Sequence, residues 1–224
     1  MTPQAEINTH YTKPLLKQAN QIHVRKAKPP KEKNERVKCV ILGDTAVGKT
    51  SLVVSYSNDT FPTKYVPTAY DNYKVVVQVD GEPVRVELCD TAGEDENPLR
   101  TLCYPGADVI ILCFSIVNPT SFHSIHTRWL QEVQALKVPV VLVGTQSDLL
   151  SNQEVIRRLR QNGETAVSPT HARRLAAKLN APYVETSART CSHLKEAFDV
   201  AITLGLKRQL KMKRPKWKKY VCCF

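Results

Sequence analysis

The residues best suited to chemistry form one run of nine, Gly43-Asp44-Thr45-Ala46-Val47-Gly48-Lys49-Thr50-Ser51, which matches the pattern G-x-x-x-x-G-K-[ST]. Its two glycines let backbone N–H groups point inward at an anion, and a helix beginning near Lys49 adds its positive dipole end. Lys49 would reach the β- and γ-phosphates of a nucleotide, and the Thr50 hydroxyl would coordinate Mg²⁺. A Gly-rich turn can match this pattern by chance, so the interpretation depends on the rest of the chain.

Three more polar motifs follow predicted strands, namely Asp90-Thr91-Ala92-Gly93, Thr145-Gln146-Ser147-Asp148 and Glu185-Thr186-Ser187-Ala188. Asp148 alone would be a loop-capping carboxylate. In this series it can instead accept two N–H bonds from the edge of guanine, while the Ala188 backbone N–H donates to the guanine carbonyl. Adenine offers neither pattern, and a site built on such hydrogen bonds rejects analogues that lack them. Four motifs in this order predict a site for a guanine nucleotide.

Apolar runs alternate with helical patterns along the middle of the chain, and they predict the elements that position these motifs. We expect a hairpin of 73–79 and 84–89, strands at 37–42, 108–114, 138–143 and 182–185, and helices at 50–57, 121–136, 154–161, 169–179 and 193–206. One hairpin within a β/α alternation predicts an α/β fold with a six-stranded, mostly parallel sheet and helices on both faces. Ligands of such folds bind at the carboxyl ends of the strands.

Charge divides the 224 residues into three parts. Residues 1–36 carry 8 Lys and Arg against 3 acids, and residues 207–224 carry 8 against none, although the whole chain has a net charge of +11. We therefore predict a disordered basic extension over 1–36, one domain over 37–206 that is close to neutral, and a polybasic tail over 207–224. Basic ends on a neutral domain indicate a membrane surface and not a nucleic acid as the partner.

The remaining composition favours a reduced, cytosolic chain. Cys39, Cys89 and Cys113 lie in strand-like apolar runs, and the N-terminal residues contain no apolar segment typical of a signal peptide. No apolar stretch approaches the ~20 residues that a membrane-spanning helix needs. His123 and His126 are three residues apart on a predicted helix, but no third ligand points to a metal site.

With these motifs in place, the region 37–206 resembles the small GTPases of the Ras superfamily. A charged helical insertion near 151–165, the run Tyr65-Val66-Pro67-Thr68-Ala69-Tyr70-Asp71-Asn72-Tyr73 and the sequence Thr-Gln-Ser-Asp are similar to the Cdc-forty-two-like part of the Rho branch. The N-terminal extension and the ending Trp217-Lys218-Lys219-Tyr220-Val221-Cys222-Cys223-Phe224 resemble the atypical Wrch/Chp branch. The resemblance implies a monomeric switch that binds GTP or GDP with Mg²⁺.

The same resemblance assigns roles to single residues. Thr68 would close over Mg²⁺ and the γ-phosphate, Asp90 would hold the metal through water, Gly93 would sense the γ-phosphate, and Phe61 would pack against the nucleoside. The residues implied in catalysis are Lys49, Thr68, Gly93 and Glu94. Residues 65–73 would form the effector surface, read by kinases with CRIB motifs and by polarity or actin-regulating proteins, and exchange factors would load the nucleotide.

Two residues depart from the family pattern at the catalytic centre. Position 45 is Thr where members that hydrolyse well have Gly, and position 94 is Glu where they have the Gln that orients the attacking water. Gln146 replaces the usual Lys of the guanine motif, as in related Rho branches. Two functions follow, a slow GTPase and a GTP-loaded binding module. A kinase or ATPase is disfavoured because the base-reading motifs specify guanine.

The chain ends in two adjacent cysteines, Cys222 and Cys223, beside the basic run 207–219. Val221 occupies the position that a prenylated C-a-a-X box reserves for Cys, so we expect palmitoylation instead. Geranylgeranylation of a C-C-X end and an unmodified basic tail are the alternatives. An acylated basic tail predicts the cytoplasmic face of the plasma membrane, with endosomes as a second location.

Overall fold

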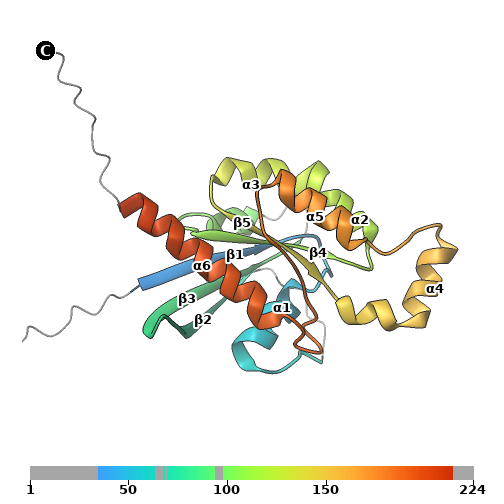
Figure 1. The fold of residues 1–224 in the computed structure, drawn as a ribbon, viewed down its shortest axis with the longest axis horizontal. Helices are drawn as coiled ribbons and strands as arrows, with labels where there is room; N and C mark the ends of the chain where they lie inside the picture. The colour runs from blue at the N-terminus through green and yellow to red at the C-terminus, as the bar shows by residue number, and fades with distance from the viewer. Residues whose placement is uncertain (1–34, 64–67, 69, 94–97, 214–224) are drawn as a thin grey trace, which may run out of the picture. The chain divides into compact units, whose positions relative to one another are not determined.

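The computed structural model describes residues 35–63, 68, 70–93 and 98–213 (Figure 1). These residues belong to one compact unit, Asn34–Phe224, and the other unit, Met1–Lys33, lies outside the described residues. Several predicted site residues also lie outside them, namely Tyr65, Val66, Pro67, Ala69, Glu94, Cys222 and Cys223.

The described residues contain a six-stranded sheet in the order β2-β3-β1-β4-β5-β6. Its strands are β1 (Glu35–Leu42), β2 (Tyr70–Val79), β3 (Glu82–Thr91), β4 (Val109–Ser115), β5 (Val140–Thr145) and β6 (Tyr183–Glu185). β2 and β3 pair antiparallel as the predicted hairpin, whereas the other neighbours pair parallel. The predicted mostly parallel sheet is therefore confirmed.

Helices cover both faces of the sheet. α1 (Lys49–Asn58) and α6 (Leu194–Lys213) lie on one face, and α2 (Pro119–Ser124), the π-helical segment η2 (Ile125–Trp129), α3 (Leu130–Leu136) and α5 (Pro169–Lys178) lie on the other. Two 3₁₀ turns, η1 (Pro98–Cys103) and η3 (Ser147–Ser151), and the helix α4 (Gln153–Gln161) complete the set. None of the helices within the described ranges combines the length and apolarity required to cross a membrane.

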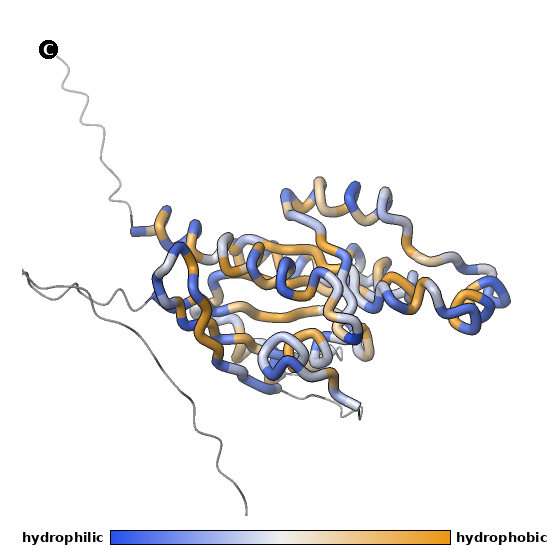
Figure 2. Tube along the Cα trace, turned by 60° about the horizontal axis from the view of Figure 1, so that its bottom comes forward, coloured by the Kyte–Doolittle hydropathy of each residue, from blue (hydrophilic) through white to orange (hydrophobic). Residues whose placement is uncertain are grey.

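Alternation along β1 explains why the sheet needs both layers. Val37, Cys39 and Ile41 join the core under α1 and α6, while Val40 and Leu42 join the core under α2, α3 and α5. A strand buried on both sides is apolar at successive positions, as β1 is from Cys39 to Leu42. Figure 2 shows the most hydrophobic colours along these central strands.

The helix predicted over 121–136 is not a single α-helix. It begins at Pro119, after the Asn118 side chain has accepted a hydrogen bond from the Ser121 N–H at 3.2 Å, and its middle turn is η2. A π turn inserts one extra residue and shifts the side chains that follow, and such turns often lie at functional sites. Here the shift accompanies the burial of Ile125 and Trp129 against the sheet.

The last helix extends beyond its predicted end at Leu206 and continues to Lys213. Two side chains support the extra turns: Arg208 donates to the Ala107 carbonyl at 3.2 Å, and Gln209 donates to the Arg36 carbonyl at 2.6 Å. The first seven residues of the segment predicted as a polybasic tail are therefore helical. A Cβ atom at Gly205 would lie 2.6 Å from the Val37 side chain, so α6 lies very close to β1 at this point.

The charged insertion predicted near 151–165 forms α4, which extends away from the sheet beside η3 (Figure 1). Asn152 caps the helix by accepting hydrogen bonds from the N–H groups of Glu154 and Val155 at 3.0 and 3.2 Å. Glu154 pairs with Arg157 and Arg158 on the exposed surface. The predicted Rho-type insert helix is thus present and is stabilised by local interactions.

Candidate functional site

The phosphate-binding loop connects β1 to α1 as predicted. Gly43 and Gly48 adopt φ values of 140° and 92°, and Ala46 between them has φ 61°, so three positions have the positive φ that curls the loop. A Cβ at position 43 would lie 2.2 Å from the Cys113 carbonyl oxygen, which requires glycine there. The Thr145 hydroxyl holds the other side of the loop by donating to the Val47 carbonyl at 2.5 Å.

Lys49, the first residue of α1, is buried under this loop and donates to the Asp44 carbonyl at 2.8 Å. Burial lowers the pKa of its ammonium group, and the nearby Asp90 and Asp44 oppose that shift. Within the described residues the Asp44 carbonyl is the one hydrogen-bond partner of this ammonium group, so its remaining N–H groups can receive an anion. Lys49 is thus placed to contact the β- and γ-phosphates.

Three side chains fit a hydrated Mg²⁺ ion beside Lys49. The hydroxyl oxygens of Thr50 and Thr68 lie 2.7 Å apart. Thr68, a residue of the predicted effector run 65–73, therefore lies at the start of α1. Asp90 is fully buried, and within the described residues neither of its carboxylate oxygens has a hydrogen-bond partner. Burial raises the pKa of this carboxyl group. A cation with its water shell would satisfy these oxygens and favour the charged form, which agrees with the metal role predicted for all three residues.

Gly93 lies directly against the phosphate-binding loop. A Cβ at position 93 would be 2.2 Å from the Thr45 nitrogen and 2.4 Å from the Asp44 carbonyl carbon, so only glycine fits. The segment that begins at Gly93 therefore starts in contact with Thr45, whose own side chain is exposed. This contact places the predicted γ-phosphate sensor next to the unusual threonine.

The base-reading motifs meet in a pocket of about 150 Å³ next to the loop. Its walls contain the predicted nucleoside-binding residues Phe61, Gln146, Asp148 and Ala188, together with Gly48, Ser51, Thr145, Leu149 and Arg189. Ser187 donates its hydroxyl to an Asp148 carboxylate oxygen at 2.7 Å and thereby orients it. Among the described residues no other side chain donates to this carboxylate, so its oxygens can also accept from a base edge.

Gln146, the residue that replaces the family lysine, connects two parts of the site. Its amide nitrogen donates to the Ala46 carbonyl at 3.2 Å, and its amide oxygen accepts from the Ser115 hydroxyl at 2.5 Å. The side chain thus joins the phosphate-binding loop to the end of β4. This geometry agrees with the expectation that the replacement leaves nucleotide binding intact.

Sequence reasoning missed Arg128 and Trp129, which reach the loop from η2. The Trp129 indole N–H donates to an Asp44 carboxylate oxygen at 2.7 Å, and Arg128 donates to the Gly93 carbonyl at 2.9 Å. The Arg128 guanidinium also lies over the indole ring, 4.2 Å from its centroid. Trp129 and Arg128 thus contact Asp44 and Gly93, the residues on either side of the predicted γ-phosphate position. In the sequence, the only signal for them was an Arg-Trp pair at the centre of a predicted helix.

Of the predicted effector run, Tyr70, Asp71, Asn72 and Tyr73 open the strand β2. β2 is the first strand in the sheet order and pairs with β3, so its other edge has no partner strand within the described residues. Among the residues that the structure covers, no cluster of three metal-ligating side chains includes His123 or His126. Thr68 is the described residue that connects the effector run to the nucleotide site.

Two comparisons with known proteins agree with this geometry. The family model described as the Ras family matches residues 38–206. The chain is 45% identical over 203 residues to the Rho-related GTP-binding protein RhoV of Rattus norvegicus and to RhoV of Homo sapiens, which covers 83% of this chain and 86% of each relative. This likeness extends beyond the nucleotide motifs to most of the chain. The protein therefore belongs to the Ras family of small GTPases, in the atypical Rho branch, and is a switch that binds GTP or GDP with Mg²⁺ and hydrolyses GTP.

Proposed function

We propose that this GTPase hydrolyses GTP weakly and remains mostly in the GTP-bound form. In that form it would control the actin cytoskeleton, cell shape and signalling through effector kinases and polarity proteins. The alternative is an essentially non-hydrolysing binding module that is permanently loaded with GTP. Both forms would be regulated by nucleotide exchange and membrane placement more than by hydrolysis.

The observation that carries this proposal is the contact between Thr45 and Gly93. An arginine finger and the water-orienting residue must both approach the γ-phosphate, and the finger is worth roughly 10³–10⁵ in rate. Because Gly93 packs against the Thr45 backbone, the exposed Thr45 side chain adds bulk close to the predicted γ-phosphate sensor, where family members that hydrolyse well have Gly. The residue after Gly93 is Glu94, whose carboxylate would repel the γ-phosphate instead of orienting a neutral water.

The test is single-turnover GTP hydrolysis with and without a Rho-type GTPase-activating protein. We expect a slow rate for the wild type and little stimulation, and partial recovery of stimulation in the double variant Thr45→Gly, Glu94→Gln. Thr63→Gly, which changes an exposed threonine outside the loop, serves as the control and should behave as the wild type. Strong stimulation of the wild-type rate would sink the proposal.

Nucleotide content distinguishes the two alternatives. Protein purified from cells should contain both GTP and GDP if hydrolysis is slow, and GTP with negligible GDP if it is absent. Prolonged incubation of the GTP-loaded protein separates the two cases further, because only a slow GTPase converts its nucleotide within hours.

The exposed edge of β2 supports the effector part of the proposal. Extended peptides bind such edges by adding a strand, with main-chain hydrogen bonds supplying affinity. Val76 on this strand is 66% exposed, which provides an apolar contact for an added strand. A CRIB-motif peptide should therefore bind the GTP form, and Val76→Asp should weaken that binding without changing nucleotide affinity.

Membrane attachment through acylation of Cys222 and Cys223 is the last part of the proposal. These residues lie outside the described structure, and the argument rests on two adjacent cysteines beside a basic run. Each buried CH₂ of an acyl chain contributes ~0.8 kcal/mol, and each nearby basic residue about 1 kcal/mol. Hydroxylamine should release the protein from plasma membranes and endosomes, whereas prenyl-transferase inhibitors should not. The opposite pattern would assign a prenyl anchor.

A further inference from the structure

Arg128 contacts the part of the site that would distinguish a triphosphate from a diphosphate. Its Nη1 group donates to the Gly93 carbonyl at 2.9 Å and lies 3.5 Å from an Asp44 carboxylate oxygen. Gly93 is the residue predicted to sense the γ-phosphate, and Asp44 belongs to the phosphate-binding loop. One guanidinium group therefore joins the two segments that would meet at the terminal phosphate.

The position of this guanidinium group is fixed by the next residue in the chain. Trp129 is fully buried, and its indole N–H donates at 2.7 Å to the same Asp44 oxygen that lies beside Arg128. The guanidinium lies over the indole ring, 4.2 Å from its centroid, and the Arg128 side chain is only 23% exposed. A planar cation stacked on an aromatic ring loses little further freedom when it donates hydrogen bonds. The Gly93 carbonyl is thus held by a donor that is itself held in place.

Gly93 depends on such a contact because it has no side chain of its own. Glycine loses more conformational freedom on ordering than any other residue. A larger residue cannot replace it, since a Cβ atom at position 93 would lie 2.2 Å from the Thr45 nitrogen. Within the described residues, the hydrogen bond from Arg128 is the one that the Gly93 carbonyl accepts. The loop therefore requires glycine at this position, and Arg128 restricts the freedom that glycine brings.

GTP and GDP make different demands on Gly93. Contact with the γ-phosphate requires its backbone to stay against the phosphate-binding loop, whereas GDP has no γ-phosphate for it to meet. A protein contact that restricts Gly93 beforehand lowers the ordering cost of binding GTP and leaves that of binding GDP unchanged. The free energy of fixing the backbone of one residue corresponds to a factor of roughly 5 to 30 in affinity. Such a factor changes the nucleotide preference measurably.

We propose that Arg128 is a positioning residue for GTP recognition, which holds Gly93 at the phosphate-binding loop and thereby raises the affinity for GTP over that for GDP. Arg128 uses the carbonyl oxygen of Gly93 and does not compete for its N–H group, the donor that a phosphate oxygen needs. This role concerns binding and not the rate of hydrolysis. The proposal therefore goes beyond the slow hydrolysis proposed above and does not depend on it.

The test measures the dissociation constants of GDP and of the β,γ-imido analogue of GTP, which is not hydrolysed. Both are obtained with the full-length protein, by competition against a fluorescent GDP in the presence of Mg²⁺. The test variant is Arg128→Met, which keeps a long side chain beside the indole ring and removes the charge and the N–H donors. Arg128→Ala provides a second removal of the donors and is judged by the same ratio of dissociation constants. The Tm of the GDP-bound form confirms that each variant is folded.

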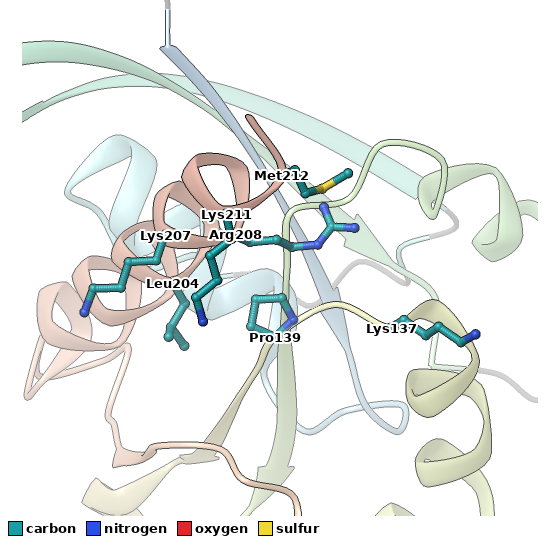
Figure 3. Close-up of a pocket in the computed structure, with 7 residues that line it drawn as sticks. All are labelled: Lys137, Pro139, Leu204, Lys207, Arg208, Lys211 and Met212. Atoms are coloured by element: carbon teal, nitrogen blue, oxygen red, sulfur yellow. The ribbon is translucent and has the colours of Figure 1, made fainter. Parts of the chain in front are cut away.

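Arg208→Met is the matched control because Arg208 makes the same kinds of contact at the opposite end of the sheet. It donates to the Ala107 carbonyl at 3.2 Å, lies 3.6 Å from an Asp108 carboxylate oxygen and is 27% exposed. Figure 3 shows it among the residues that line a groove of about 630 Å³ at that end. β4 has seven residues, so its amino end, near Asp108, lies about 23 Å from its carboxyl end, where the nucleotide site is.

We expect Arg128→Met to bind the GTP analogue roughly 5- to 30-fold more weakly than the wild type and to bind GDP equally well. Arg128→Lys keeps a cation that can donate to the Gly93 carbonyl, so it should recover part of the lost preference. Arg208→Met should leave the ratio of the two dissociation constants at its wild-type value. Equal weakening of both nucleotides in Arg128→Met, or the same change of ratio in Arg208→Met, would show that Arg128 only supports the fold and would overturn the proposal.

Discussion

At the scale of single residues, guanine recognition depends on the orientation of Asp148. The Ser187 hydroxyl fixes one oxygen of this carboxylate at 2.7 Å, and the pocket wall formed by Phe61 and Ala188 completes the space for a base. A carboxylate that accepts two N–H bonds is chemically matched to guanine alone among the common purines. The selectivity of the protein is therefore concentrated in one side chain.

Replacing Asp148 by Ala should abolish the preference for GTP over ATP. Hydrogen bonds to a charged group contribute about 1.5–3 kcal/mol each, so losing two of them should weaken GTP binding by more than about a hundred-fold. Competition of GTP, ITP and ATP against a fluorescent nucleotide measures the effect. Asp199→Ala, on an exposed turn of α6, is the control. Retained selectivity in Asp148→Ala would show that another group reads the base.

The same scale shows what could be predicted from sequence. The loop residues Gly43 and Lys49 were predictable because phosphate chemistry fixes their spacing, and Asp90 because a carboxylate at a strand end has a limited set of roles. Trp129 was not predictable. Its contact with Asp44 depends on the π turn before it, and the sequence of a π turn differs little from that of an α-helix.

At the scale of elements, η2 connects a helix of the second layer to the nucleotide site. Trp129 contacts Asp44 in the phosphate-binding loop, Arg128 contacts Gly93 at the start of the switch segment, and Arg100 of η1 lies over the same indole ring at 5.0 Å. Glu132 on α3 pairs with Arg100 at 3.0 Å. A displacement of the segment that begins at Gly93 would therefore change the contacts of η2 and, through Arg100 and Glu132, those of α3.

Trp129→Phe tests this connection because it keeps an aromatic ring and removes only the N–H donor. The Asp44 carboxylate would lose its shortest hydrogen bond, and we expect a loss of about 1–3 kcal/mol in the free energy of unfolding. Nucleotide dissociation should also accelerate, since the loop is less constrained. Denaturant titration and release of a fluorescent nucleotide provide the two measurements. The comparison is Phe122→Leu. Phe122 packs against the same core, but among the described residues its side chain makes no hydrogen bond to the phosphate-binding loop. A lower free energy of unfolding with unchanged nucleotide release would contradict the connection.

The observed ends of elements agree with the predicted ones where a local cap or turn ends the element. They differ from the predicted ends where contacts with residues distant in the sequence determine the end. α4 begins at its Asn152 cap, close to the predicted start. α6 was expected to end where apolar residues stop, at Leu206, but it continues to Lys213 because Arg208 donates to the Ala107 carbonyl, just before β4, and Gln209 donates to the Arg36 carbonyl in β1. Such partners are distant in sequence and leave no local signal.

At the scale of the whole molecule, the bound nucleotide and metal should contribute much of the stability. The oxygens of Asp90 have no hydrogen-bond partner within the described residues, and burial penalises their charge. Chelation of Mg²⁺ should release nucleotide and lower Tm, since a ligand present at 100 times its Kd stabilises the fold by about 2.7 kcal/mol. Calorimetry with and without EDTA, at fixed nucleotide concentration, measures this shift. The variant Thr50→Asn should show a much smaller response to EDTA, and an equal response would place the metal elsewhere.

The close approach of Gly205 to Val37 has a mechanical consequence. A helix of twenty residues is about 30 Å long and bends little, and the absence of a side chain at one position lets it lie against the central strand. α6 therefore packs as a stiff helix directly against β1, an inner strand of the sheet. The direction in which α6 ends, at Lys213, is therefore fixed relative to β1, the strand that leads into the phosphate-binding loop.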